Sequence, residues 1–210
     1  MEDTLLGIVD DFKVFVMSGI QTLPLTMAGT LLVLGFGTAN YPMLFCLVGM
    51  LVVAPILPFL INLAADDTWN TPGGGLIPGP SNHIIPQWFV LVYFFLAYMM
   101  TNAILIYQIE PADTDDTQKT ALRKSQCVMG IIVVGLCMVV LGAIQMSGLQ
   151  GGKIGLAFLG MGIGAGIGVG WYYALNTSGQ GRLADLFGIA NRLLTPSAFV
   201  NEPVGCVPVA

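Results

Sequence analysis

Glycine occupies every second position from Gly160 to Gly170, inside the uncharged stretch 154–175. In water this stretch would not hold a helix, because each glycine costs roughly 1 kcal/mol relative to alanine. In a bilayer the backbone must satisfy its own hydrogen bonds, so a helix is nearly forced. The stretch therefore predicts a transmembrane helix.

The glycines of this helix form two stripes. Successive glycines lie about 200° apart around a helix of roughly 3.6 residues per turn, and each stripe repeats the G-x-x-x-G spacing that lets helix backbones approach closely. The predicted helix-packing residues are Gly160, Gly164 and Gly168 on one face and Gly162, Gly166 and Gly170 on the other. We expect the helix to lie between two neighbours. The expected neighbours are the fourth span, with its own glycines, and either the hairpin of the first two spans or a second copy of the chain.

Composition agrees with a chain that crosses the membrane several times. Hydrophobic residues make up 55% of the sequence and charged residues only 9%, against about 25% charged in an ordinary soluble domain. The net charge of −5 gives no indication of nucleic-acid binding. We predict an all-α membrane protein whose partners are membrane lipids and other membrane proteins, with a homo-oligomer as a further possibility.

Hydropathy divides the chain into three parts. Residues 1–21 alternate polar and apolar side chains with a helical period, which predicts an amphipathic helix at the membrane interface. Residues 22–175 form the transmembrane domain, and 176–210 form an extramembrane tail in which 182–194 predict a second amphipathic helix. The expected spans are 22–39, 43–64, 87–108, 126–146 and 154–175. Pro55 and Pro58 should kink the second of them.

Five spans place the two termini on opposite sides of the membrane. The side of the link 109–125 and of the tail holds five basic residues, and the other side holds only Lys13 and Lys153. Because cytoplasmic loops carry the excess of Lys and Arg, the C-terminus is expected on the cytoplasmic side.

The sequence gives no indication of an enzyme. The expected spans contain no Asp, Glu, Lys, Arg or His, although an ionisable group inside a bilayer is the usual mark of an intramembrane active site. His83 lies outside any metal-binding spacing, the cysteines show no C-x-x-C pattern, and no nucleotide fingerprint follows a strand. We therefore expect no catalytic residues, no cofactor and no metal.

A small channel or transporter remains the alternative. Asn102 is the deepest amide in the expected spans, and such a residue either lines a path or makes an interhelical hydrogen bond. We interpret it as an interhelical hydrogen-bonding residue.

Two irregular segments are expected to contact protein partners. The link 66–86 contains four prolines and four glycines in twenty-one residues, which excludes regular structure. Both this link and the tail retain apolar side chains outside the spans. The predicted partner-contact residues are Trp69, Ile84, Ile85, Phe199 and Val200.

Residues 24–63 (PLTMAGTLLVLGFGTANYPMLFCLVGMLVVAPILPFLINL) and 184–208 (ADLFGIANRLLTPSAFVNEPVGCVP) resemble small multi-pass membrane proteins of large icosahedral double-stranded DNA viruses. The resemblance covers about a third of the chain. It implies a virion inner-membrane or minor capsid protein that links the bilayer to the protein shell, with a capsid-facing C-terminal tail. It implies no active-site residue.

Overall fold

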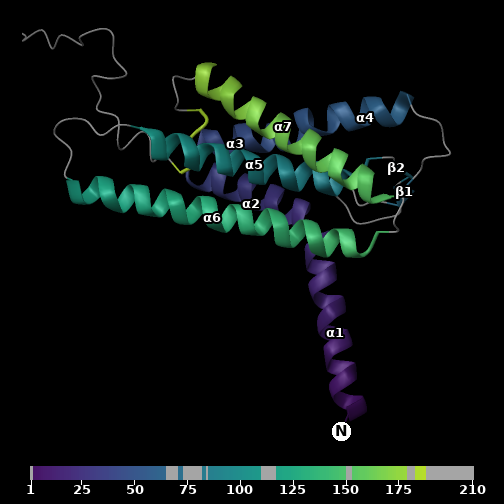
Figure 1. Ribbon diagram of the computed structural model, residues 1–210. Helices are drawn as coiled ribbons and strands as arrows, with labels where there is room; N and C mark the ends of the chain where they lie inside the picture. The colour runs from purple at the N-terminus through teal and green to yellow at the C-terminus, as the bar shows by residue number, and fades with distance from the viewer. Residues whose placement is uncertain are drawn as a thin grey trace, which may run out of the picture.

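The computed structural model describes residues 2–64, 71–72, 82–83, 85–109, 117–149, 153–178 and 183–187. Nearly all of these residues are helical (Figure 1). Four helical stretches are long and apolar enough to cross a membrane, namely Tyr41–Ile61, Gln87–Gln108, Thr120–Ser147 and Ile154–Ser178. A bent pair, Val14–Gln21 with Leu23–Gly37, adds a fifth if it counts as one span. The protein is therefore an all-α integral membrane protein with four to five spans.

The first span is short and bent. Helix α1 (Glu2–Gln21) ends just before α2 (Leu23–Gly37), and the axis of its last part, Val14–Gln21, differs from that of α2 by 54°. Pro24 occupies the first turn of α2, where its missing N–H leaves no broken bond. At about 1.5 Å per residue, the fifteen residues of α2 reach only about 22 Å, less than the roughly 30 Å hydrocarbon core. The last turns of α1 must therefore contribute if this pair crosses the bilayer.

Helix α1 projects away from the rest of the molecule (Figure 1). Phe12 and Phe15 are 66% and 76% exposed. The end of α1 contacts the bundle, where the Trp88 indole donates a 2.8 Å hydrogen bond to the Ile20 carbonyl. This arrangement suits an amphipathic helix whose apolar side chains meet lipid rather than protein.

The second span contains a π-helical turn ahead of its prolines. Helix α3 (Tyr41–Val48) continues through η1 (Gly49–Val53) into α4 (Ala54–Ala64). The Ala54 N–H bonds to the Gly49 carbonyl, an i to i+5 step. Pro55 has no N–H to donate to a carbonyl of the preceding turn, and the wider π-helical turn accommodates this missing hydrogen bond. Residues 41–61 thus remain one span, so the expected kink takes the form of a local π-helical segment.

Helix α5 (Gln87–Gln108) lies at the centre of the bundle. Helix α7 (Ile154–Ser178) packs along it, and α6 (Thr117–Ser147) lies on its other side (Figure 1). Both hydrophobic cores include α5 residues: one joins α5 to α2, α3 and α7, and the other joins it to α6 and the end of α1. In an apolar stretch of 18 residues within α5, 67% of the residues are buried inside the protein, against 17% in the corresponding stretch of α6.

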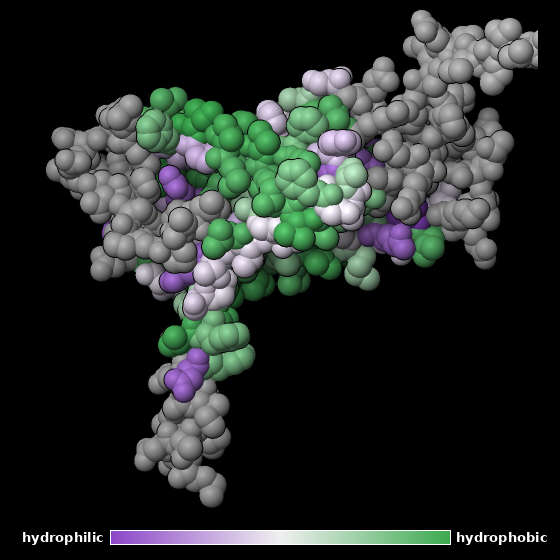
Figure 2. Space-filling model, turned by 180° about the vertical axis from the view of Figure 1, so that it is seen from behind, coloured by the Kyte–Doolittle hydropathy of each residue, from purple (hydrophilic) through white to green (hydrophobic). Residues whose placement is uncertain are grey.

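The surface and the long link complete the fold. Figure 2 shows hydrophobic residues gathered across the middle of one face, with hydrophilic residues to either side, as a bilayer requires.

The link 66–86 was expected to lack regular structure. Its described residues instead include a two-residue antiparallel ladder, β1 (Thr71–Pro72) with β2 (Asn82–His83).

Candidate functional site

One glycine stripe of α7 forms a seam with α5. A Cβ added to Gly164 would collide with the Val90 carbonyl oxygen and lie 2.8 Å from the Val90 Cα. A Cβ at Gly168 would collide in the same way with the Phe94 carbonyl. Gly160 is looser, since its Cβ would lie 3.3 Å from the Ile85 side chain. The two helix backbones are therefore in direct contact at Gly164 and Gly168, a distance that only glycine allows.

The second stripe faces open space. A Cβ at Gly162, Gly166 or Gly170 would meet no atom within 4 Å. The neighbour of the first stripe is α5, the third expected span, and not the fourth as expected from the short turn. Helix α6 approaches α7 near Gly142, whose added Cβ would lie 3.2 Å from the Met161 methyl group. The hairpin of the first spans does not cover the second stripe either.

A hydrogen-bonded polar cluster lies where α5 and α7 approach the tail. The Tyr172 hydroxyl donates to the Asn102 side-chain oxygen at 3.2 Å, and Asn102 is only 1% exposed. The Tyr98 and Tyr172 rings meet edge to face at 5.1 Å between centroids. Asn102 therefore joins two helices, in agreement with its interpretation as an interhelical hydrogen-bonding residue.

The start of the tail is buried against this cluster. The Tyr98 hydroxyl donates to the Ala184 carbonyl at 2.9 Å, and the Asn40 amide donates to the Leu186 carbonyl at 2.8 Å. Ala184, Asp185 and Leu186 are at most 2% exposed. We call residues 183–187 the buried tail segment, and the Phe187 side chain at its end is 51% exposed. They form turns, whereas the sequence predicted a helix over 182–194, and the remainder of that helix lies outside the described residues.

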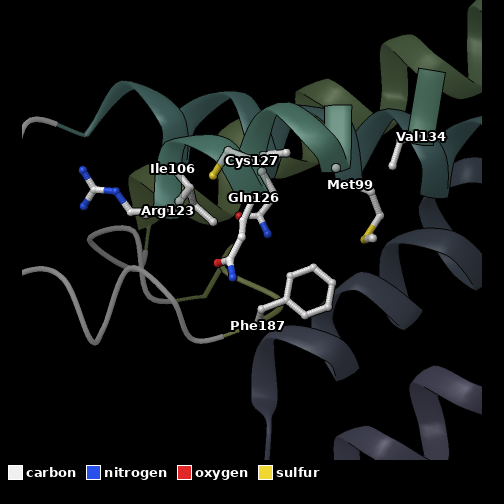
Figure 3. Close-up of a pocket in the computed structure, with 10 residues that line it drawn as sticks. Met99, Ile106, Arg123, Gln126, Cys127, Val134 and Phe187 are labelled. Atoms are coloured by element: carbon white, nitrogen blue, oxygen red, sulfur yellow. The ribbon is translucent and has the colours of Figure 1, made fainter. Parts of the chain in front are cut away.

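A pocket opens between α5 and α6 beside the buried tail segment (Figure 3). It encloses about 140 Å³. Figure 3 shows Arg123 at one end with its guanidinium group directed away from the pocket, Met99 and Val134 at the other end, and Phe187 between them. Asn102, Gln126 and Cys127 also line it.

Arg123 is the functional candidate that the sequence reasoning missed. The sequence favours a short helix over 114–125 that runs into a fourth span beginning at 126; α6 begins at Thr117 and is continuous, so this arginine falls within the candidate span Thr120–Ser147. Its side chain is 6% exposed. The available signal was the helical run 117–125, which continues into the span without a turn residue.

The expected partner-contact residues have different outcomes. Trp69, Ile84, Phe199 and Val200 lie outside the described residues. Ile85 is completely buried in the core of the chain itself, close to Gly160, rather than on an outer surface. Its position next to Pro86 at the start of α5 directs it into the bundle.

The described residues offer little for redox or metal chemistry. Cys46, Cys127 and Cys137 are free thiols. Across the described ranges, no three His, Cys, Asp or Glu side chains are grouped as metal ligands would be. The arrangement can pack helices, anchor the tail and enclose a small apolar group beside a cation.

No protein-family model, curated protein or solved structure matches the chain.

Proposed function

We propose that this chain is a non-enzymatic structural membrane protein that holds a protein layer to a bilayer. In the specific form suggested by the sequence resemblance, it is a virion inner-membrane or minor capsid protein whose C-terminal side faces the shell. Its partners are then membrane lipids and other membrane or capsid proteins.

The observation that carries this proposal is the attachment of the tail to the bundle. Two side-chain hydrogen bonds, from Tyr98 and Asn40, hold the buried tail segment at the end of α5 and α7. The twenty-three residues 188–210 therefore leave from a fixed point on the membrane domain. Force applied to the tail would act on the core of the bundle, as a tether requires.

Charge supports the same orientation. The end of the bundle that holds the tail also holds the start of α6, with Lys119, Arg123 and Lys124 in its first turns. Basic residues next to a span favour the cytoplasmic side. On this basis the tail faces the cytoplasm or a shell assembled there.

Asn102, the deepest amide of the spans, gives the channel alternative no support. Asn102 is hydrogen-bonded to Tyr172 and buried between helices. The first glycine stripe of α7 packs directly against α5, so α5 occupies the space beside these glycines.

Removal of residues 188–210 tests the proposal, because this truncation keeps the buried tail segment. A matched control replaces the same residues with a Gly/Ser segment of equal length. We expect both variants to stay in the membrane after alkaline carbonate extraction but to be lost from purified virus particles that retain the full chain. Equal recovery of all three with particles, or absence of the full chain from them, would contradict the proposal.

A liposome flux assay separates the alternative function. The purified full chain should give no selective ion or solute flux above protein-free liposomes. Reproducible selective flux that Asn102→Leu abolishes would replace the structural proposal with a channel.

A further inference from the structure

Arg123 is a buried cation whose hydrogen bonds are incomplete. One guanidinium nitrogen, Nη2, donates to the Ile109 carbonyl at 2.9 Å, and Nε has no partner. The hydroxyl of Thr120, one helical turn earlier, is also buried without a partner. Buried polar atoms in native proteins are almost always satisfied by protein, water or a ligand. These two neighbouring donors therefore indicate that an acceptor binds here.

The acceptor should be an anion. No carboxylate within the described ranges forms an ion pair with Arg123, and the side chain is only 6% exposed. A buried charge is costly unless an opposite charge or several hydrogen bonds compensate it. Guanidinium groups bind phosphate oxygens with two parallel hydrogen bonds, so a phosphate suits this site well.

The pocket beside Arg123 has the size and lining for a short apolar chain. Its volume of about 140 Å³ is close to the roughly 150 Å³ of an apolar cavity that binds benzene. Met99, Ile106 and Val134 supply apolar walls. Gly130 also lines the pocket, and a Cβ there would meet no atom within 4 Å.

The polar and apolar ends are ordered as in a lipid. Arg123 lies at the end of the pocket nearest the start of α6, and Val134 lies at the opposite end (Figure 3). Eleven residues of helix separate them, about 16 Å along the axis at 1.5 Å per residue. A cation at the membrane boundary with an apolar slot leading inward matches a headgroup followed by an acyl chain.

We propose that this pocket binds one anionic phospholipid. The phosphate accepts hydrogen bonds from the Arg123 Nε and the Thr120 hydroxyl, and one acyl chain enters the slot beside Gly130. Basic pockets between helices on the cytoplasmic side bind anionic headgroups in this way. Inorganic phosphate shares the headgroup chemistry but cannot fill the slot.

Native mass spectrometry of the purified full chain tests the proposal. The detergent-solubilised protein is titrated with phosphatidylglycerol, with phosphatidylcholine of the same acyl chains, or with inorganic phosphate. We expect one molecule of phosphatidylglycerol to be retained, with an affinity at least about tenfold above that for phosphatidylcholine, because the choline ammonium offsets the phosphate charge and brings a second cation close to Arg123. Phosphate alone should not displace it at equal concentration.

Two pairs of variants locate the site. Arg123→Met should lower the affinity for phosphatidylglycerol on the order of tenfold, while the matched change Lys124→Met, on an exposed neighbouring side chain, should leave it unchanged. Gly130→Leu should fill the slot and reduce retention of the lipid. Ala143→Leu, an exposed position on the same helix, should not.

Several results would overturn the proposal. One is equal retention of the two lipids, and another is displacement by phosphate as effective as by phosphatidylglycerol. Loss of stability in Arg123→Met without any retained lipid in the wild type would show that the chain itself supplies the anion. If Arg123→Met does not fold, Gly130→Leu decides, because full lipid retention in that variant would exclude the slot.

Discussion

Substitution of Gly164 by alanine is the sharpest test of the packing between α5 and α7. The added Cβ would lie 2.8 Å from the Val90 Cα and closer still to its carbonyl oxygen. Carbon atoms pack at about 3.5–4.0 Å, so the helices must separate by about 1 Å. The atoms in contact belong to backbone and cannot rotate away. We therefore expect an overpacking cost of about 1–3 kcal/mol.

Gly166→Ala is the matched control. The two positions lie on the same helix two residues apart, and a Cβ at Gly166 meets no atom within 4 Å. Both substitutions gain the same intrinsic helix propensity, about 1 kcal/mol at most. The difference in the free energy of unfolding between the two variants therefore isolates the seam.

The measurement is equilibrium unfolding in mixed detergent micelles, followed by circular dichroism and tryptophan fluorescence. Trp171 is on α7, one turn from the tightly packed Gly168, and reports on that end of the seam. We expect Gly164→Ala to be less stable than Gly166→Ala by about 1–3 kcal/mol. Equal stability within about 0.5 kcal/mol, the usual range for surface substitutions, would refute the seam.

Three further predictions concern hydrogen bonds. Asn102→Leu leaves the Tyr172 hydroxyl buried without a partner and should cost about 1–3 kcal/mol; Tyr172→Phe added to it should recover part of that loss in thermal unfolding, and no recovery would contradict the pairing. Tyr98→Phe should cost about 1 kcal/mol and speed proteolysis of the buried tail segment, whereas an unchanged digestion rate would show that the hydroxyl does not hold the tail. Trp88→Phe removes the bond to Ile20, so spin-label distances between α1 and α5 should broaden; an unchanged distribution would show that packing alone holds α1.

The helical fold was largely predictable from the sequence. In lipid the backbone has to satisfy its own hydrogen bonds, so an apolar run of sufficient length becomes a helix almost regardless of composition. Helix α5 covers 87–108, the same residues as the expected third span, and α7 extends the expected fifth span from 175 to 178. Even the glycine-rich run between Gly160 and Gly170 is helical throughout.

Which glycine stripe of α7 packs against a neighbouring helix, and against which helix, was not predictable. The two stripes have the same spacing, and nothing in α7 itself distinguishes them. A short turn fixes only the ends of α6 and α7, and the remainder of α7 packs on α5, where the backbone of Val90 and Phe94 is accessible. Which helix packs against a glycine stripe of α7 therefore depends on the packing of the whole bundle.

The sites were harder to predict than the helices. Ile85 is apolar and lies next to an irregular link, so the sequence alone suggested an outer surface, yet it is enclosed in the core. Arg123 is charged, so it was assigned to the link before the fourth span; a helix there was expected, but the burial of this side chain was not. In both cases burial depends on contacts with distant segments rather than on the residue type.

Footprinting of the unmodified protein with a photoreactive lipid tests the central claim most directly. A carbene generated on the acyl chain labels whatever faces the bilayer, and mass spectrometry locates the labelled residues. If α5 is the enclosed centre of a membrane-embedded bundle, Leu136 and Val139 of α6, at 62% and 71% exposed, should be labelled strongly, and the fully buried Phe94 and Tyr98 should be protected. Labelling of Phe94 and Tyr98 as strong as that of Leu136 and Val139 would contradict the arrangement.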